Sequence, residues 1–162
     1  MKLVVISDTH IANSSQDLPR KILEELNDAA MVIHAGDLAD LSVWEKLKKA
    51  CKNIKAVYGN MDSSQLKKKL PEKEIFKAGK FKIGIMHGWG PSDKLVERMG
   101  EVFRNTGVNI VIFGHSHAAL SLEKNDVLYF NPGSPTDTIY AAYNSFGIIE
   151  INDKIEARIV RL

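Results

Sequence analysis

The chain has 162 residues and a formal net charge of +2 at pH 7, from 22 Lys and Arg against 20 Asp and Glu. This near balance argues against nucleic acid or an anionic membrane as the main partner. The single cysteine, Cys51, excludes an internal disulfide and a thiolate metal cage. With 44 % hydrophobic residues, residues 1–162 are expected to form one globular domain with a sizeable core.

The N-terminal region predicts a cytoplasmic protein. Met1 and Lys2 lead directly into an apolar run at residues 3–6, which is too short for the core of a signal peptide. No apolar run in the sequence approaches the ~20 residues that a membrane-spanning helix needs. We therefore expect no membrane partner, and the sequence leaves open whether the chain forms a homo-oligomer.

The first sixty residues alternate apolar runs with amphipathic segments. The runs at residues 3–6, 31–33 and 54–58 are typical of buried strands. Apolar residues have the spacing of an amphipathic helix from about residue 18 or 19 to residue 26, and again over residues 41–49. This β-α-β-α-β pattern predicts a parallel sheet with right-handed crossovers, in which ligands bind beyond the carboxyl ends of the strands.

The second half of the sequence has a different order of predicted strands and helices. A hairpin is expected at residues 73–86 with its turn at Gly79-Lys80, and a helix from about Ser92, as N-cap, to Asn105. Short strands are expected at residues 110–113, 119–123, 127–131, 146–151 and 155–160, with turns at 125–126 and 152–153. The fold class that follows is α/β (mixed α+β), with two packed mixed sheets and helices on their outer faces.

Compact polar motifs follow five of the strand-like runs. They are Asp8-x-His10, Gly36-Asp37, Gly59-Asn60, His87-Gly88 and Gly114-His115-x-His117. Each motif alone is more often a turn, a cap or a loop than a site. Their joint placement at strand ends predicts one shared metal site, because carboxyl ends of neighbouring strands converge.

The donor types in these motifs indicate the metal. Carboxylate, amide and imidazole together suit Zn, Mn, Fe, Ni or Co rather than Ca or a lone Mg. The seven expected ligands are too many for one ion; they are Asp8, His10, Asp37, Asn60, His87, His115 and His117. Two ions ~3.5–4 Å apart with a bridging carboxylate would use them, and such sites act on phosphate esters.

The five blocks, in this order, resemble the metallophosphoesterase (calcineurin-like) superfamily. The short length and the block Asn131-Pro132-Gly133-Ser134 resemble its small prokaryotic phosphodiesterase branch. The resemblance implies a four-layer sandwich and two divalent transition-metal ions per chain, with Mn favoured and Ni, Zn, Fe or Co as alternatives. It assigns Asp8, His10 and His117 to one ion. It assigns Asn60, His87 and His115 to the other, with Asp37 as the bridge.

The activity implied is hydrolysis of a small-molecule phosphodiester. In this mechanism a hydroxide held between the ions attacks phosphorus in line, and the ions stabilise the charge of the transition state. Asp37, Asn60 and His115 are the expected catalytic residues, and the Asn60 amide would also donate a hydrogen bond to the substrate.

One position departs from many family members. Met61 stands where they have a histidine that contacts the phosphate and can protonate the leaving group. The small phosphodiesterase branch commonly lacks this histidine as well. Poor leaving groups such as simple alkoxides are therefore not expected to be cleaved well. Asp62 is expected to orient Asn60 or a loop rather than act as the acid.

The sequence allows two alternatives to a phosphodiesterase. A metal-bearing interaction scaffold with vestigial chemistry, like the small subunit of retromer, shares the expected fold. A serine hydrolase is suggested only by Gly114-x-Ser116-x-Ala118, and a strand rather than a helix is expected after it.

Three further expectations concern residues around the site. His34 is expected to lie beneath the site, and the lysines at residues 67–69 are expected to form a solvent-exposed face. Specificity is assigned to the loops around Asn13 and Ser14, Trp89, and Pro135.

Overall fold

The structure is a computed structural model that describes residues 1–12 and 17–162. The strands are β1 (Lys2–Ile6), β2 (Met31–His34), β3 (Ile54–Ala56), β4 (Lys73–Ala78), β5 (Phe81–Met86), β6 (Ile110–Ile112), β7 (Leu120–Lys124), β8 (Val127–Asn131), β9 (Ser145–Ile151) and β10 (Ile155–Arg161). The helices are α1 (Arg20–Leu26), α2 (Leu41–Ala50), α3 (Ser64–Lys69) and α4 (Leu95–Val102), with a 3-10 turn, η1 (Ser92–Lys94). None of these helices is long and apolar enough to cross a membrane.

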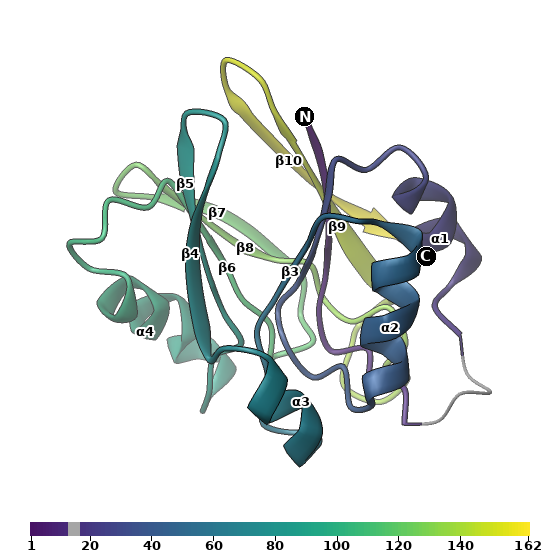
Figure 1. Cartoon of the computed structure of the whole chain (residues 1–162). Helices are drawn as coiled ribbons and strands as arrows, with labels where there is room; N and C mark the ends of the chain where they lie inside the picture. Colours follow the sequence, from purple (N-terminus) through teal and green to yellow (C-terminus); the bar gives the residue numbers. More distant parts are fainter. Residues whose placement is uncertain (13–16) are drawn as a thin grey trace.

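The strands form two mixed sheets, as expected, and each sheet has five strands (Figure 1). The first has the order β10-β9-β1-β2-β3, and the second β4-β5-β6-β8-β7. The pairs β1–β2 and β2–β3 are parallel, as the β-α-β-α-β pattern predicted. In the second sheet β5–β6 and β6–β8 are parallel, whereas both edge strands pair antiparallel.

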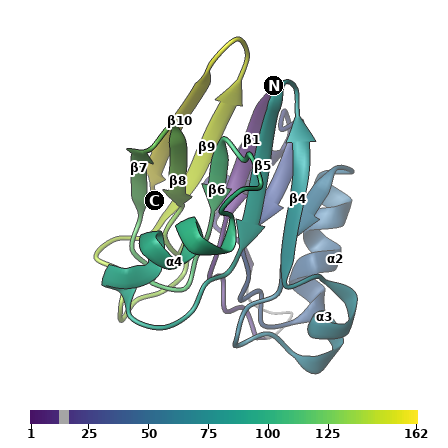
Figure 2. The same cartoon turned by 90° about the vertical axis from the view of Figure 1, so that its left-hand side faces the viewer.

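The sheets pack face to face with helices outside, which gives the four layers seen from left to right in Figure 1; in Figure 2, α4 lies in front of the second sheet. Helices α1 and α2 pack on the first sheet through residues such as Ile22 and Leu47, and α4 packs on the second through Met99. Strand β1 shows why its sequence is uniformly apolar. Val4 faces the helices while Val5 faces the other sheet, so both faces of the strand are buried.

Two helical expectations need correction. The segment predicted as one helix from Ser92 to Asn105 is the 3-10 turn η1 followed by α4, which ends at Val102. Ser92 is not the N-cap, because Pro91 precedes the turn and makes no side-chain cap. The helix ends early because the backbone leaves the helical region at the C-cap Phe103, with φ −101° and ψ 10°, and Asn105 then takes a φ of 61°.

Helix α3 was missed by the sequence reasoning. It has six residues, too few for a clear apolar period, and its N-cap Ser63 accepts a hydrogen bond from the Leu66 amide at 3.4 Å. Lys67, Lys68 and Lys69 form its last turn and are exposed, so they are the solvated face that was expected.

The loops after five strands meet at one end of the two sheets. The Asp8 amide donates to the Gly36 carbonyl at 3.0 Å, which joins the loops after β1 and β2. The Gly114 amide donates to the His87 carbonyl at 3.0 Å, which joins the loops after β6 and β5. The fold therefore brings the polar motifs of both sheets to a common edge.

Candidate metal centre

The polar side chains at this edge are carried by unusual backbone. Asp8, His10, Asp37, His115 and His117 all have positive φ, between 46° and 71°. A left-handed conformation costs a non-glycine residue on the order of 1–3 kcal/mol, and it persists where the surroundings enforce it. Five such residues in one place indicate that the fold is organised to aim these side chains.

Glycines let the loops approach closely enough for this arrangement. A Cβ atom at Gly59 would lie 2.2 Å from Oδ1 of Asp37, and one at Gly114 would lie 2.6 Å from Oδ2 of Asp8. Gly36 has a φ of 97°, and a Cβ there would lie 2.6 Å from Nδ1 of His87. Side chains at these positions would displace the residues expected to bind metal.

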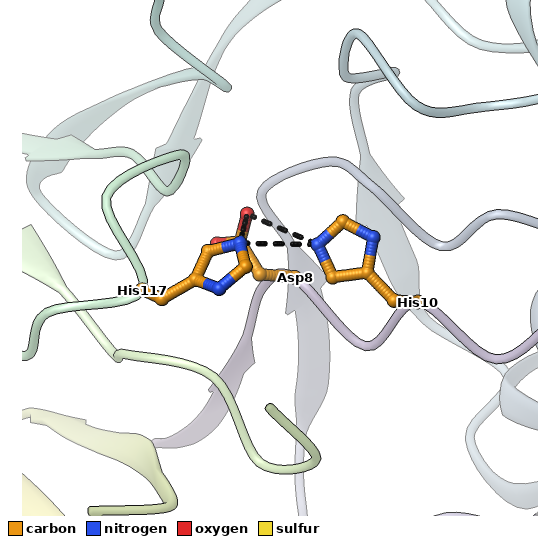
Figure 3. A group of neighbouring side chains, drawn as sticks. All are labelled: Asp8, His10 and His117. Atoms are coloured by element: carbon orange, nitrogen blue, oxygen red, sulfur yellow. Dashed lines mark hydrogen bonds and ion pairs between the residues drawn. The ribbon is translucent and has the colours of Figure 1, made fainter. Parts of the chain in front are cut away.

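Asp8, His10 and His117 form one cluster of donors (Figure 3). The Nε2 atoms of His10 and His117 lie 3.1 Å apart. The Oδ1 atom of Asp8 lies 3.4 Å from the His117 Nε2 and 3.9 Å from the His10 Nε2. The three residues assigned to one ion on the family resemblance thus lie together.

A second cluster adjoins the first and shares Asp8 with it. It consists of Asp8, Asp37 and His87. The Oδ2 atom of Asp37 lies 3.3 Å from His87 Nε2 and 3.8 Å from His10 Nε2, so this carboxylate faces a histidine of each cluster. A carboxylate in that position is suited to bridging.

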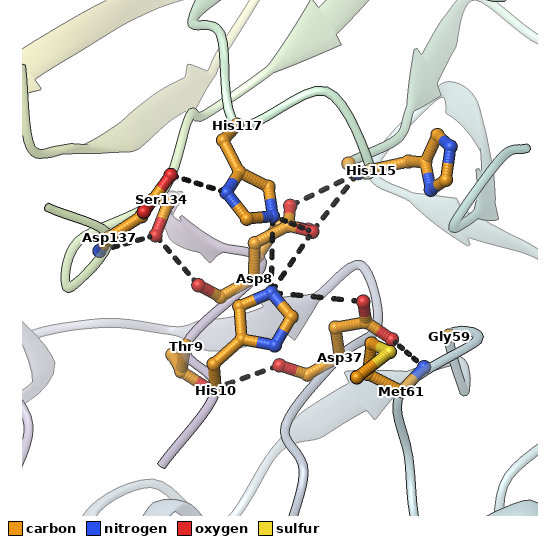
Figure 4. Close-up of polar contacts among 12 residues, drawn as sticks. Asp8, Thr9, His10, Asp37, Gly59, Met61, His115, His117, Ser134 and Asp137 are labelled. Carbon is orange, nitrogen blue, oxygen red and sulfur yellow. Dashed lines mark hydrogen bonds and ion pairs between the residues drawn. The ribbon is translucent and has the colours of Figure 1, made fainter. Parts of the chain in front are cut away.

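Asn60 and His115 extend the second cluster. The Oδ1 atom of Asn60 lies 3.2 Å from His87 Nε2 and 3.1 Å from His115 Nδ1. The His115 ring points away from Asp8 (Figure 4), and its Nε2 is 3.1 Å from the Gly90 carbonyl oxygen. The main chain of His115 faces the other way, since its amide donates to both carboxylate oxygens of Asp8 at 3.1 Å.

The donor set fits two metal ions. The side chains of Asp8 and Asp37 are 0 % and 3 % exposed, and their ion-pair partners among the described residues are all histidines. Two ligands at about 2.1 Å from one ion lie about 3.0–3.4 Å from each other. The shorter donor separations here fall in that range, so buried carboxylates and imidazoles converge as a cation would require.

The electrostatics of the cluster are those of closely coupled acids and bases. Burial alone would raise the pKa of Asp37, but the hydrogen bond and charge of His87 hold it below its usual value. Burial lowers the pKa of His87, and Asp37 and Asp8 more than offset this, so the net shift is upward. Burial and the charge of His87 lower the pKa of His115.

Asp62 holds the loop that carries Asp37. Its carboxylate accepts hydrogen bonds from the amides of Asp37 at 3.0 Å, Ala39 at 2.7 Å and Gly59 at 2.7 Å. A further hydrogen bond joins the same two loops, because Oδ1 of Asp37 accepts from the Met61 amide at 2.7 Å. Asp62 therefore orients a loop, and it does so through main-chain groups.

Asp137 is a neighbour of the site that the sequence reasoning missed. Its Oδ2 atom lies 2.5 Å from Nδ1 of His117, on the side of the ring away from Asp8 (Figure 4). The hydrogen bond to Asp8 raises the pKa of His117, burial lowers it, and the hydrogen bond to Asp137 raises it further. The net result is a pKa of about 9. The only sequence signal was its place three residues after Ser134, whose hydroxyl donates to the Asp8 carbonyl at 2.7 Å.

His34 lies beneath the site, fully buried at the end of β2. Its Nε2 is 3.2 Å from Oγ1 of Thr9, the residue between Asp8 and His10. Burial lowers the pKa of His34 to about 3, so the ring is neutral. His34 thus supports the loop of the first motif from below.

An open cleft of about 980 Å³ lies over the clusters. It is lined by His10, Asp37, Asn60, His115 and His117, together with Met61 and residues 135–138. Tyr140 lines the cleft as well, and the side chains of Met61 and Tyr140 are 63 % and 78 % exposed. The loop around Pro135 therefore forms part of its wall, whereas Trp89 lines an adjacent pocket. Asn13 and Ser14, also expected near the substrate, lie outside the described residues.

A family model described as the calcineurin-like phosphoesterase superfamily domain matches residues 1–154. A probable metallophosphoesterase of Methanocaldococcus jannaschii is 34 % identical over 163 residues, spanning 99 % of this chain and 81 % of that protein.

Two solved structures are similar over nearly their whole lengths. An archaeal phosphodiesterase superposes with a TM-score of 0.80 at 28 % identity and covers 100 % of both chains. Vps29 of Entamoeba histolytica, solved as a complex with Zn²⁺, has a TM-score of 0.76 at 28 % identity and covers 99 % of both chains.

Proposed function

The chain belongs to the calcineurin-like phosphoesterase superfamily, and we propose that it is a dinuclear, metal-dependent phosphodiesterase. The observation that carries the proposal is the pair of buried carboxylates, Asp8 and Asp37, each facing histidines of two adjoining clusters. The name of the structurally similar archaeal phosphodiesterase supports a diester as the substrate.

Asp8, His10 and His117 would hold one ion, and Asn60, His87 and His115 the other, with Asp37 between them. When bound, two such ions supply Lewis-acid stabilisation of phosphoryl oxygens and lower the pKa of water. The Zn²⁺ complex of Vps29 supports a transition metal, and we propose Mn or a related divalent ion.

The protein groups would position the substrate and the ligands. Since Oδ1 of Asn60 is directed at His87 and His115, its Nδ2 group remains to donate to a phosphoryl oxygen. The His115 amide and the Ser134 hydroxyl fix Asp8 from its side chain and its carbonyl. Such positioning lowers the reorganisation that the transition state requires.

Met61 sets the expected leaving group. Its side chain is 63 % exposed in the cleft wall and has no proton to donate. Esters whose leaving groups are stable as anions, such as aryl esters, should therefore be cleaved much faster than alkyl esters.

The scaffold alternative is less well supported. A scaffold gains nothing from five residues held at positive φ or from two buried carboxylates. The large apolar side chains with the highest exposure among the described residues, Ile139, Tyr140 and Met61, lie at the cleft or next to it rather than in a remote patch. This distribution favours binding of a ligand at the cleft.

The test is hydrolysis of bis(4-nitrophenyl) phosphate beside 4-nitrophenyl phosphate, on metal-stripped protein reloaded with Mn, Ni, Zn or Mg. We expect metal-dependent turnover of the diester in preference to the monoester. Asp37→Ala and His115→Ala should remove it while circular dichroism shows an intact fold. Undiminished hydrolysis in either variant would refute the assigned site, and silence with every metal despite two bound ions would favour the scaffold.

A further inference from the structure

A second pocket, of about 420 Å³, adjoins the cleft at Asn60, which lines both. On the cleft side Asn60 contacts His115, and on the pocket side it contacts His87, which also lines the pocket. The phosphate-binding end of the site therefore lies where two cavities meet. Both volumes are in the range of small-molecule sites.

We propose that the second pocket binds one ester group of the diester substrate, that this group is a neutral planar aromatic, and that Trp89 is its main contact. The inference rests on the proposed function and specifies its substrate. A phosphodiester has an organic group on two sides of phosphorus, and two cavities that meet at Asn60 match that shape. A monoester would leave one of them empty.

Trp89 is exposed where an aromatic side chain would normally be covered. It is 47 % exposed and lines the pocket beside Tyr58. Trp is highly buried on average, because its indole has a large apolar surface. An exposed indole next to a polar site offers a flat apolar face on which a planar ligand group can stack.

The position of Trp89 is fixed by its neighbours. Gly88 and Gly90 have φ values of 96° and 78°, and a Cβ at Gly90 would lie 2.7 Å from the Arg98 guanidinium. That guanidinium donates to the carbonyls of Trp89 at 3.2 Å and Pro91 at 3.4 Å. These hydrogen bonds join the turn that carries Trp89 to α4, so the backbone conformation at Trp89 is fixed.

The charges on the pocket wall favour a neutral group. Lys67 and Glu72 both line it, one of each sign. Lys67 is engaged with the site, because its Nζ donates to the Asn60 carbonyl at 2.8 Å. A second phosphate would meet the Glu72 carboxylate, whereas an uncharged ring meets Trp89 and Tyr58 without an electrostatic penalty.

The experiment uses the two tryptophans of the chain. In the Trp44→Phe protein, Trp89 is the only source of indole fluorescence. Trp44 lies on α2, and in the described structure its Nε1 is buried without a hydrogen-bond partner, so Phe loses no bond there. The Zn-loaded protein is titrated with diphenyl phosphate, which is cleaved slowly, and with dimethyl phosphate as the matched control.

We expect a saturable change of Trp89 emission with diphenyl phosphate and none with dimethyl phosphate. In otherwise wild-type protein, Trp89→Ala should raise KM for bis(4-nitrophenyl) phosphate by roughly two- to tenfold, and Trp89→Phe should restore most of it. Metal content, measured by elemental analysis, should be the same in all three proteins.

The outcomes separate this inference from the proposed function. Inhibition by diphenyl phosphate without any change in Trp89 emission would overturn the pocket and leave the function standing. A change in emission in a protein that hydrolyses no diester would keep the pocket as an aryl phosphodiester site and overturn the function. Equal KM values for Trp89→Ala and wild type would also overturn the pocket.

Discussion

The Nδ1 atom of His117 lies 2.5 Å from the Oδ2 atom of Asp137, while Nε2 of the same ring faces Asp8 at 3.4 Å. A carboxylate behind a metal-binding imidazole fixes the tautomer and the orientation of the ring. Asp137 is itself held in place, since it accepts hydrogen bonds from the amides of Ile139, Tyr140 and Ala141. His117 is therefore oriented from outside the cluster.

Asp137→Asn should weaken metal binding without removing any proposed ligand. The amide accepts less strongly from Nδ1, so the His117 ring is less well oriented and less basic. Loss of such a partner typically lowers metal affinity by 10–100-fold. Chelator competition with Zn²⁺ measures this, with Asp153→Asn in an exposed turn as the control. Equal affinity in Asp137→Asn and the control would contradict the orienting role.

Asp62→Ala should destabilise the fold. The variant leaves the buried amides of Asp37 and Gly59, and the partly buried amide of Ala39, without their acceptor. An unsatisfied buried donor costs roughly 1–3 kcal/mol, so we expect the free energy of unfolding to fall by about 3 kcal/mol. Urea denaturation of the metal-free protein at pH 7 measures it, and Asp153→Ala should change it by less than about 0.5 kcal/mol. A similarly small effect in Asp62→Ala would show that the loop does not depend on this carboxylate.

His34 should make the folded state sensitive to acid. Its pKa is lowered to about 3 by burial, against 6.5 for the free side chain, so the unfolded chain takes up a proton that the folded chain does not. Stability contributed in this way is unaffected above pH 6.5 and is lost progressively as the pH falls from 6.5 towards 3.

The comparison is between wild type and His34→Gln, which removes the titration and retains a polar side chain. From pH 6.5 to 4.5 the wild-type unfolding free energy should fall by about 2 kcal/mol more than that of the variant, because each pH unit contributes up to about 1.4 kcal/mol. Urea denaturation across this range gives both curves. Parallel curves would mean that His34 takes up its proton as readily in the folded as in the unfolded protein, which contradicts the lowered pKa.

Gly59→Ala should damage the metal centre through a single methyl group. The added Cβ would lie 2.2 Å from Oδ1 of Asp37, so the carboxylate has to move. Gly84→Ala is the matched control, because its Cβ would meet the Phe103 ring at 2.5 Å in the core, away from the clusters. Both variants should lose stability, but only Gly59→Ala should lose metal affinity, by at least about tenfold. Equal affinities in the two variants would contradict the steric role of Gly59.

Much of the architecture could be predicted from the sequence, because hydrophobic periodicity reports burial directly. Val4 and Val5 illustrate this, since a run that is apolar at every position has to be covered on both faces. Helix α3 could not be found in this way, because six residues carry too little periodicity.

The site was predictable in part for a different reason. The five motifs follow strands whose ends converge, so their meeting could be inferred from position alone. The role of Asp137 could not, because it depends on how a loop turns back to His117, twenty residues earlier. Nor does sequence spacing reveal that Asp62 acts through three backbone amides, because those amides belong to two separate loops.

The most direct test of the central claim is to follow hydrolysis of bis(4-nitrophenyl) phosphate while Mn²⁺ is added stepwise to metal-free protein. Two ions acting together predict little turnover at one equivalent and a steep rise that ends at two equivalents per chain. Full activity without metal, or a plateau at one equivalent, would contradict a dinuclear centre formed by Asp8, Asp37 and their histidines.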